Sequence, residues 1–559
     1  MHLNRPNLAR FSRKQKILAA GVAALLVGVG AVAGSILFYD HVVVVNLPLP
    51  NLKPHGDIPL QPLTTFADSL NQQLPDDVSA LPAHCQQQSG DWVSKENINP
   101  GISFTPEMWR SLQLYHESGS VLWLDRQSAT CGDRIKIHAS LYPNSANGSI
   151  DKAARTLEVL RVGWYGGAGA RMMWNSGPVK LKYRNTPNLR NATRMIETRW
   201  PTTTSFVVGE DWTPGLYLAA SLNKSGTIEN IAPFILRSSS SSSKLLLVHS
   251  TLTWSAYNSF GGHSTYSTSN SKLDARSKVS SLDRPYAGSG MNHINRDAIA
   301  FVQYLESTGL NIDQVSDIDL SNSPSLVNQY GGMIFSGHPE YMTRNEFDTV
   351  SAARNLGINI AFMGANSAYW QTRTEPSPAG PDRHMVIYRN ALLDPQTDWQ
   401  KVSIGFANKR INTPPSLLTG EKTAGVHVTG TMTVVSIPKW LKIPVSATLA
   451  QWSPNSEIDS IATSAAAPTK VHLLFSGKFS LTDPEAPLVA TGRSLTAQTI
   501  WFTVPSGSAT FVAGINYWPC EVSPTCSESR VSEATRAVLQ SVTTQVLTLW
   551  QSKAVGKGF

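Results

Sequence analysis

The fold is decided by the stretch Lys244-Leu245-Leu246-Leu247-Val248-His249, an apolar run that polar residues follow at once. Two further apolar runs, residues 332–335 and 358–363, have the length of buried strands. Two segments with helical features lie between these runs. One carries Ile299, Val302 and Leu305 at helical spacing, and the other opens with the capping-box pattern Thr343-Arg344-Asn345-Glu346. Strands that alternate with helices predict a parallel sheet covered on both faces, so we expect an α/β domain over residues 244–555.

The chain before this domain has a different pattern of apolar residues. Residues 86–237 contain short runs of β type, such as Arg134–His138 and Gly215–Ala219, broken by glycine, proline and asparagine. This pattern predicts an antiparallel β-sandwich. Residues 238–243 are six consecutive serines, which indicate a linker between the two domains.

The N-terminus combines a basic segment with an apolar run. Residues 1–16 hold five basic residues and no acid, and residues 17–39 are 23 residues without a charge. A membrane-spanning helix needs about 20 apolar residues, and basic residues before it stay in the cytoplasm. We therefore expect a single-pass cell-membrane protein, anchored in the lipid bilayer through residues 17–39, with a cytoplasmic N-terminus and the bulk of the chain extracytoplasmic. The proline-rich residues 40–85 are then a stalk.

A cleaved signal peptide is the alternative for this N-terminus, because Ala31-Val32-Ala33 has the small residues of a cleavage site. Both interpretations export the protein. The four cysteines agree with export, since an even number outside the cytoplasm favours two disulfides. Cys520 with Cys526 forms a plausible short loop, and Cys85 with Cys131 would stabilise the first domain, although four cysteines allow three pairings.

The net charge of +8 is concentrated at the N-terminus. Five of the 47 basic residues lie in the first 39 positions, so the rest of the chain has 42 basic and 39 acidic residues, a net charge of +3. This small excess is spread along the chain without a basic run, which excludes nucleic acid as a partner.

Polar clusters follow four of the predicted strands, where parallel α/β sheets bind their ligands. They supply tyrosine, histidine, glutamate and asparagine, a set rich in oxygen donors. No cysteine lies between Cys131 and Cys520, which excludes a cysteine nucleophile at a strand–helix elbow in that stretch. The clusters are Thr253-Trp254-Ser255-Ala256-Tyr257-Asn258, Asp283-Arg284-Pro285-Tyr286, Ser336-Gly337-His338-Pro339-Glu340-Tyr341 and Gly364-Ala365-Asn366-Ser367.

These motifs, together with Ala513-Gly514-Ile515-Asn516-Tyr517-Trp518 and the glycine-rich residues 160–171, resemble the large (beta) subunit of N,N-dimethylformamidase over about residues 100–550. The resemblance implies an immunoglobulin-like β-sandwich followed by an α/β domain similar to class I glutamine amidotransferases. With the anchor, the expected fold class is a multidomain chain with an N-terminal transmembrane helix and these two domains. A small second subunit or a homo-oligomer is implied as a partner.

The resemblance also implies a mononuclear iron (Fe3+) held by two tyrosines and one glutamate. Motif by motif, these are Tyr257, Tyr286 and Glu340, with His338 and Asn366 lining the pocket. Three anionic oxygens suit hard ferric iron, which can polarise an amide carbonyl and activate water. The expected function is iron-dependent hydrolysis of an amide or related C–N bond in a small substrate.

Two positions depart from the family pattern. Arg389 stands where a lysine is expected, and arginine cannot shuttle protons. Glu457 is the only fair match for an expected catalytic glutamate, so we predict it as a general base. These departures leave an alternative open, a non-catalytic binding or scaffold protein of the cell envelope that keeps the fold.

Overall fold

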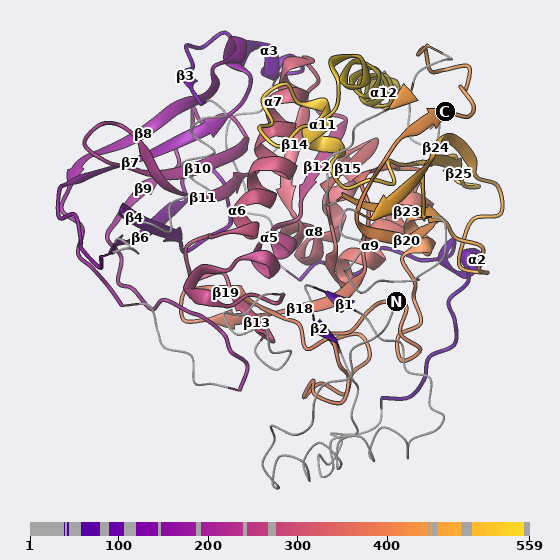
Figure 1. The fold of residues 1–559 in the computed structure, drawn as a ribbon, viewed down its shortest axis with the longest axis horizontal. Helices are drawn as coiled ribbons and strands as arrows, with labels where there is room; N and C mark the ends of the chain where they lie inside the picture. Colours follow the sequence, from indigo (N-terminus) through magenta and orange to yellow (C-terminus); the bar gives the residue numbers. More distant parts are fainter. Residues whose placement is uncertain are drawn as a thin grey trace, which may run out of the picture.

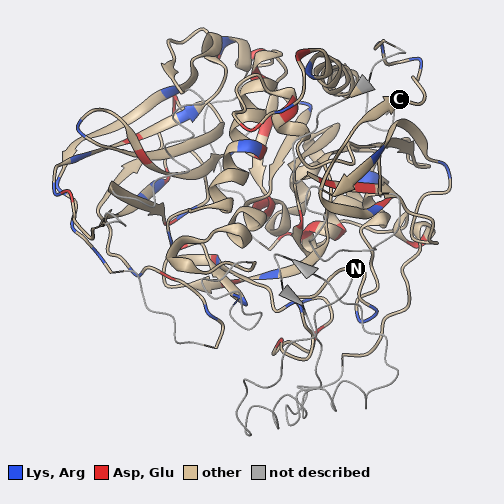
Figure 2. Ribbon diagram, viewed as in Figure 1, with Lys and Arg blue, Asp and Glu red and all other residues tan. Residues whose placement is uncertain are grey.

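The computed structural model describes residues 58–78, 89–104, 119–143, 147–185, 192–238, 243–266, 276–444, 456–481 and 495–552, with the short strand segments 38–39, 42–43 and 448–449. The protein is mainly β sheet with few helices, and its larger sheets lie side by side in Figure 1. Basic and acidic segments are interspersed along the described ribbon (Figure 2).

The first folded part consists of two sheets that enclose one apolar core. A six-stranded sheet and a three-stranded sheet contribute Leu122, Ile137, Val159, Phe206 and Phe234 to this core, so the two sheets form two layers. In spatial order, the larger sheet contains β3 (Ile102–Ser103), β8 (Gly169–Val179), β7 (Arg155–Val162), β10 (Gly215–Leu222), β11 (Ile228–Leu236) and β5 (Ser128–Ala129). The smaller contains β4 (Gly119–Leu124), β6 (Arg134–Tyr142) and β9 (Thr204–Val207).

The second part is built on an eleven-stranded sheet whose halves differ in strand direction. One half is parallel, with strands β14 (Ile312–Ser316), β12 (Leu245–His249), β15 (Gly332–Gly337), β17 (Asn359–Gly364) and β26 (Ala509–Val512). The other half is antiparallel, with β25 (Leu495–Thr503), β24 (His472–Leu481), β20 (Glu421–Gly430) and β23 (Ser456–Ile461). Strands β21 (Met432–Val434) and β22 (Thr448–Leu449) flank it.

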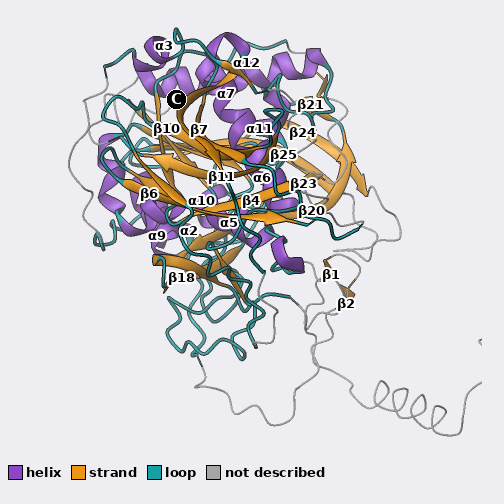
Figure 3. Cartoon of the chain, turned by 90° about the vertical axis from the view of Figure 1, so that its left-hand side faces the viewer, coloured by secondary structure: helices purple, strands orange, loops and turns teal. Residues whose placement is uncertain are grey.

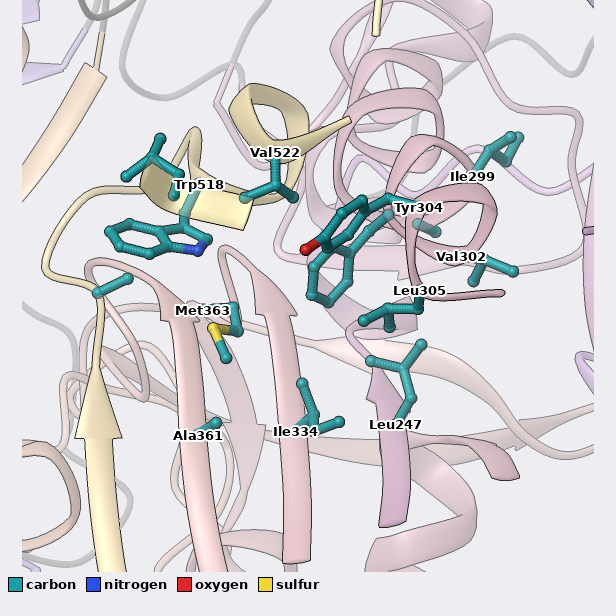
Figure 4. Close-up of a cluster of buried hydrophobic side chains, with 14 of the residues drawn as sticks. Leu247, Ile299, Val302, Tyr304, Leu305, Ile334, Ala361, Met363, Trp518 and Val522 are labelled. Carbon is teal, nitrogen blue, oxygen red and sulfur yellow. The ribbon is translucent and has the colours of Figure 1, made fainter. Parts of the chain in front are cut away.

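Both faces of the parallel half are covered, because alternate residues of β12 enter different cores. Leu245 and Leu247 belong to one apolar cluster, and Leu246 and Val248 belong to another. Figure 4 shows the first cluster, in which side chains from α7 (Ala300–Ser307) and α11 (Trp518–Val522) pack on β12, β15 and β17. Figure 3 shows helices around the sheet. The remaining helices of this part include α5 (Thr251–Tyr257), α6 (Ser289–His293), the π-helix η6 (Ile294–Ile299), α8 (Asp317–Asn322), α9 (Arg344–Asn355), α10 (Ser416–Thr419) and α12 (Glu533–Ser552).

A four-stranded sheet completes this part, and the chain before it adds short helices. The sheet order is β13 (Val279–Ser281), β19 (Gly380–Val386), β18 (Trp370–Ser377) and β16 (Tyr341–Thr343). Helix α3 (Trp92–Glu96) precedes the first sheets. Helix α2 (Phe66–Ser69) lies in the predicted stalk, yet Ile58 and Phe66 pack on the second apolar cluster of the α/β part.

The structure corrects the predicted fold class in two respects. Strands β20 to β25 pair antiparallel instead of alternating with crossover helices, so the molecule is mainly sheet and its second part is not uniformly α/β. The N-terminal transmembrane helix is also wrong. In the described part of the chain, no helix has both the length and the apolar character needed to cross a membrane.

The predicted anchor over residues 17–39 lies outside the described residues except at its end. There, β1 (Phe38–Tyr39) pairs antiparallel with β2 (Val42–Val43). Valine and aromatic residues favour strands, which agrees with the pairing of these four residues. The predicted single-pass location in the cell membrane is corrected on the same finding.

One of the two expected disulfides is confirmed, because Cys520 and Cys526 are bonded across the end of α11. Cys131 is disulfide-bonded as well. Its expected partner, Cys85, lies outside the described residues.

Candidate functional site

Glu340 is the centre of a cluster of polar side chains at the carboxyl ends of β12, β15 and β17. Its side chain is fully buried, and both carboxylate oxygens accept hydrogen bonds. Tyr257 donates to Oε2 at 2.9 Å, and Tyr266 donates to Oε1 at 2.5 Å. The indole of Trp370 donates to Oε1 at 3.1 Å, and His338 Nε2 lies 3.1 Å from Oε2. Four side chains therefore meet at one carboxylate.

The backbone that carries Glu340 leaves β15 through a tight turn. Gly337 has a φ of +69°, and a Cβ atom on Gly364 of the neighbouring strand would lie 1.4 Å from the Gly337 carbonyl oxygen. Only glycine permits both this conformation and this close approach. The Glu340 amide then donates to the His338 carbonyl at 2.8 Å, and its carbonyl accepts from the Trp370 amide at 2.9 Å. The turn thus fixes the carboxylate over the ends of both strands.

The two phenols come from the segment after β12. Tyr257 ends α5, and Tyr266 follows a glycine turn through Gly261 (φ +79°) and Gly262 (φ +88°), which brings the chain back beside the helix. Their rings stack with centroids 4.2 Å apart. Burial and the nearby Glu340 charge raise the pKa of Tyr266 well above its usual value. In the metal-free protein Tyr266 is therefore a neutral donor to Glu340.

His338 links Glu340 to a second carboxylate. Its Nδ1 donates to the Ala365 carbonyl oxygen at 3.1 Å, and its Nε2 lies 3.1 Å from Glu340 and 3.5 Å from Glu457 Oε1. Burial lowers the pKa of His338, but the charges of Glu457 and Glu340 outweigh burial and raise that pKa to about 9. Burial acts to raise the pKa of Glu340, but the contact with His338 outweighs burial and holds the pKa of Glu340 below its usual value.

Asn366 and Glu457 meet beside His338, although they are far apart in the sequence. Asn366, after β17, has a φ of +52°, and its Nδ2 donates to Glu457 Oε2 at 2.9 Å. Strands β20 and β23 hold this asparagine. Thr423 donates to Asn366 Oδ1 at 2.7 Å, and the Asp459 carboxylate accepts the Asn366 amide at 2.9 Å. Burial raises the pKa of Glu457, as does the Glu340 charge. The antiparallel half of the sheet therefore positions one side of the site.

Five of the six predicted site residues come together here: Tyr257, His338, Glu340, Asn366 and Glu457. The sixth, Tyr286, is placed differently. Its ring belongs to an apolar cluster with Trp254 and Met291, and its hydroxyl accepts from Gln127 at 3.4 Å. Tyr266 takes the position beside Glu340 that the sequence analysis gave to Tyr286.

Tyr266 and the groups behind it were missed by sequence reasoning. One signal was available, since Tyr266 lies only nine residues after Tyr257 and follows two glycines that permit a reversal. Arg389, which stands where the family pattern has a lysine, contacts Tyr266 and Tyr341. His293 packs on the Tyr257 ring with centroids 4.3 Å apart.

The residues around Glu340 fit a hard metal ion. Two phenol oxygens each lie within hydrogen-bond distance of one carboxylate, and such oxygens are preferred by ferric iron. The protons that now join the phenols to Glu340 are those that a bound cation displaces, because a metal ion strongly favours deprotonated ligands. Tyr257, Tyr266 and Glu340 could therefore hold the iron that the sequence resemblance implies.

A second group that could hold a metal ion lies where the first sheets meet the β13–β19 sheet. It consists of Glu197, Asp283 and His384. His384 Nε2 lies 2.5 Å from Glu197, which also accepts from Arg199. Asp283 accepts from Arg383 at 2.7 Å. Each carboxylate already faces a guanidinium, so its charge is balanced without a metal ion.

Comparisons with known proteins agree with the sequence motifs. A family model described as N,N-dimethylformamidase beta subunit-like, C-terminal, matches residues 156–529. This range includes Tyr257, Tyr266, Glu340 and Glu457, so the whole candidate site lies within the match. No curated protein matches the chain.

Proposed function

The chain belongs to the N,N-dimethylformamidase beta subunit-like family, and from this premise we propose that it hydrolyses the C–N bond of a small amide. The iron site of this hydrolase consists of Tyr257, Tyr266 and Glu340. The observation that carries the proposal is the convergence of two phenols and one buried carboxylate at the carboxyl ends of parallel strands, where α/β sheets bind ligands.

The side chains around Glu340 have separate tasks in this proposal. A ferric ion held there supplies a Lewis acid for the amide carbonyl and for water. Glu457 Oε1 accepts a proton from the attacking water as the C–O bond forms, and this proton passes to the amide nitrogen as the C–N bond breaks. Burial raises the pKa of Glu457, which brings this carboxylate closer to the pKa that a general base needs at neutral pH.

Asn366 and His338 hold the base rather than exchange protons in this scheme. The Asn366 amide donates to Glu457 Oε2, which leaves Oε1 for the water. His338 faces Oε1 at 3.5 Å and donates to Glu340, so its position connects the carboxylate of the iron site to that of the base. In this proposal the carboxylate of the iron site and that of the base face the same imidazole nitrogen, His338 Nε2.

The test is metal analysis and amide hydrolysis by the full chain loaded with ferric iron. We expect one iron per chain, a visible phenolate-to-iron absorption band, and release of amine from short formamides or amides. Glu340→Gln should remove the iron and lower kcat/KM at least about 100-fold, because a metal ligand is lost. Glu375→Gln is the matched control, since Glu375 is 45% exposed and pairs with Arg373.

Two tyrosine variants separate this site from the assignment made on sequence alone. Tyr266→Phe should weaken iron binding and change the absorption band, whereas Tyr286→Phe should keep both. A chain without iron or amide hydrolysis would contradict the proposed function. Iron binding without turnover would favour the non-catalytic alternative, and loss of the band in Tyr286→Phe alone would restore Tyr286 as the ligand.

A further inference from the structure

A chain of hydrogen bonds leads from Arg389 to the candidate iron site. Arg389 Nη2 donates to the Tyr341 hydroxyl, which donates to the Tyr266 hydroxyl at 2.7 Å. Tyr266 in turn donates to Glu340 Oε1 at 2.5 Å. One guanidinium is thus connected through two phenols to the central carboxylate.

The guanidinium of Arg389 also stacks on the aromatic side chains that touch Glu340. It lies 4.2 Å from the centroid of Tyr266 and 4.8 Å from that of Trp370. Its hydrogen-bond partners are hydroxyls of Tyr341 and Thr265, and neither is a carboxylate. A buried cation held against a ring in this way favours negative charge on that ring.

The backbone of Arg389 supports a specific role. Its φ is +57°, a left-handed conformation that is uncommon for residues other than glycine and is typically retained where surrounding contacts require it. Here the contacts are the stack on Tyr266 and the bond to Tyr341. The side chain is therefore directed at the phenol pair by its own backbone.

We propose that Arg389 is a positioning residue. Through Tyr341 it fixes the Tyr266 oxygen toward Glu340, and it stabilises the negative charge of the Tyr266 phenolate when iron is bound. This inference rests on the proposed function, because it takes Tyr266 as an iron ligand. Arginine suits the role because its planar group stacks on a ring and donates in a fixed direction, whereas lysine is a flexible point charge. Arg389 stays protonated throughout, so its contribution is geometry and charge rather than proton transfer.

The test compares Arg389→Lys and Tyr341→Phe with wild-type protein, all loaded with ferric iron. Arg389→Lys should raise the iron dissociation constant about tenfold, as found when groups that orient a metal ligand are removed. Its phenolate-to-iron band should move to longer wavelength, because the phenolate loses a stabilising cation. Tyr341→Phe should shift both quantities in the same direction by a smaller amount.

Arg354→Lys is the matched control, since Arg354 is also buried, stacks at 4.9 Å on Phe66 and donates to Ser69 Oγ. It should leave the band and the iron affinity unchanged. Wild-type iron binding with an unaltered band and affinity in Arg389→Lys would overturn this inference and leave the proposed function standing. A band shift of equal size in Arg354→Lys would overturn it as well, and failure of the wild type to bind iron would overturn both.

Discussion

Two of the buried clusters of charged side chains in the described part of the chain differ in how their carboxylates are neutralised. The first joins the sandwich to the α/β part. There Arg161 is fully buried and donates to Glu306 at 2.6 Å and to the Tyr165 hydroxyl at 2.9 Å. Tyr165 and Arg171 both donate to Glu96. Every carboxylate of this junction cluster therefore faces a guanidinium.

The site cluster has the opposite balance. Glu340 and Glu457 share one imidazole, His338, and their other hydrogen-bond partners are uncharged groups such as the phenols and the amide of Asn366. The nearest guanidinium that the structure links to them, Arg389, bonds to a phenol instead. The site cluster thus presents an excess of oxygen acceptors.

The difference is the one expected between a structural cluster and the proposed binding site. In the junction cluster the charges cancel locally, and breaking a pair would leave an uncompensated buried charge. In the site cluster the surplus of carboxylate and phenol oxygens is retained at the end of a sheet, which suits a cation and a substrate. Composition alone does not distinguish them, because both contain tyrosines, glutamates and a cation.

Removing the cation of the junction cluster should have the largest effect. Arg161→Met leaves Glu306 buried at 4% side-chain exposure without its guanidinium, so we expect unfolding to become easier by about 3–5 kcal/mol. Chemical denaturation of the iron-free protein measures this. Arg199→Met is the control, since Arg199 is 77% exposed in its pair with Glu197 and its loss should have a much smaller effect on stability. Equal losses of stability in both variants would contradict the view that the junction cluster depends on its buried guanidinium.

The second prediction uses the pH dependence of stability to test the buried carboxyl of Asp459 beside the site. Burial raises the pKa of Asp459 to about 7, although the hydrogen bond from the Asn366 amide acts to lower this pKa. Between pH 4 and 7 the folded protein holds a proton that the unfolded chain has lost. Stability should therefore fall as pH rises through this window, by about 1 kcal/mol for each pH unit, and level off above pH 7.

Asp459→Asn should remove this contribution, because asparagine accepts the same amide hydrogen bond without ionising. The variant should match wild type near pH 4 and be more stable than wild type at pH 8. Asp398→Asn, at a position with 44% side-chain exposure, serves as the control. If the slope between pH 4 and 7 is the same in Asp459→Asn as in wild type, Asp459 is not the group responsible.

Sequence reasoning placed the candidate site at the residues that directly follow buried strands. Tyr257, His338, Glu340 and Asn366 come after apolar runs, and the carboxyl ends of parallel strands meet at one edge. The choice between Tyr266 and Tyr286 could not be made this way. Both follow short polar segments, and only the packing of Tyr286 beside Trp254 and Met291 shows that its ring turns into the core.

Other features depend on contacts that no local pattern contains. Glu457 reaches Asn366 across 91 residues because β20 and β23 extend the sheet in antiparallel fashion, and short alternating runs do not specify which strand they join. The predicted anchor over residues 17–39 lies outside the described residues except at its end, where Phe38–Tyr39 pair with Val42–Val43 as strands.

The smallest predicted effect concerns Thr423, which holds Asn366 from the antiparallel half of the sheet. Thr423→Val keeps the shape of the side chain but removes the hydroxyl that donates to Asn366 Oδ1 at 2.7 Å. Since one neutral hydrogen bond contributes about 0.5–1.5 kcal/mol, we expect kcat for amide hydrolysis to fall about threefold to tenfold while iron binding is kept. Thr433→Val on β21 is the matched control, because that hydroxyl faces the Ser476 carbonyl at 3.4 Å. A loss of iron in Thr423→Val would mean that Asn366 supports the metal ligands themselves. The roles of positioning the base and positioning the metal ligands would then not be separated at His338.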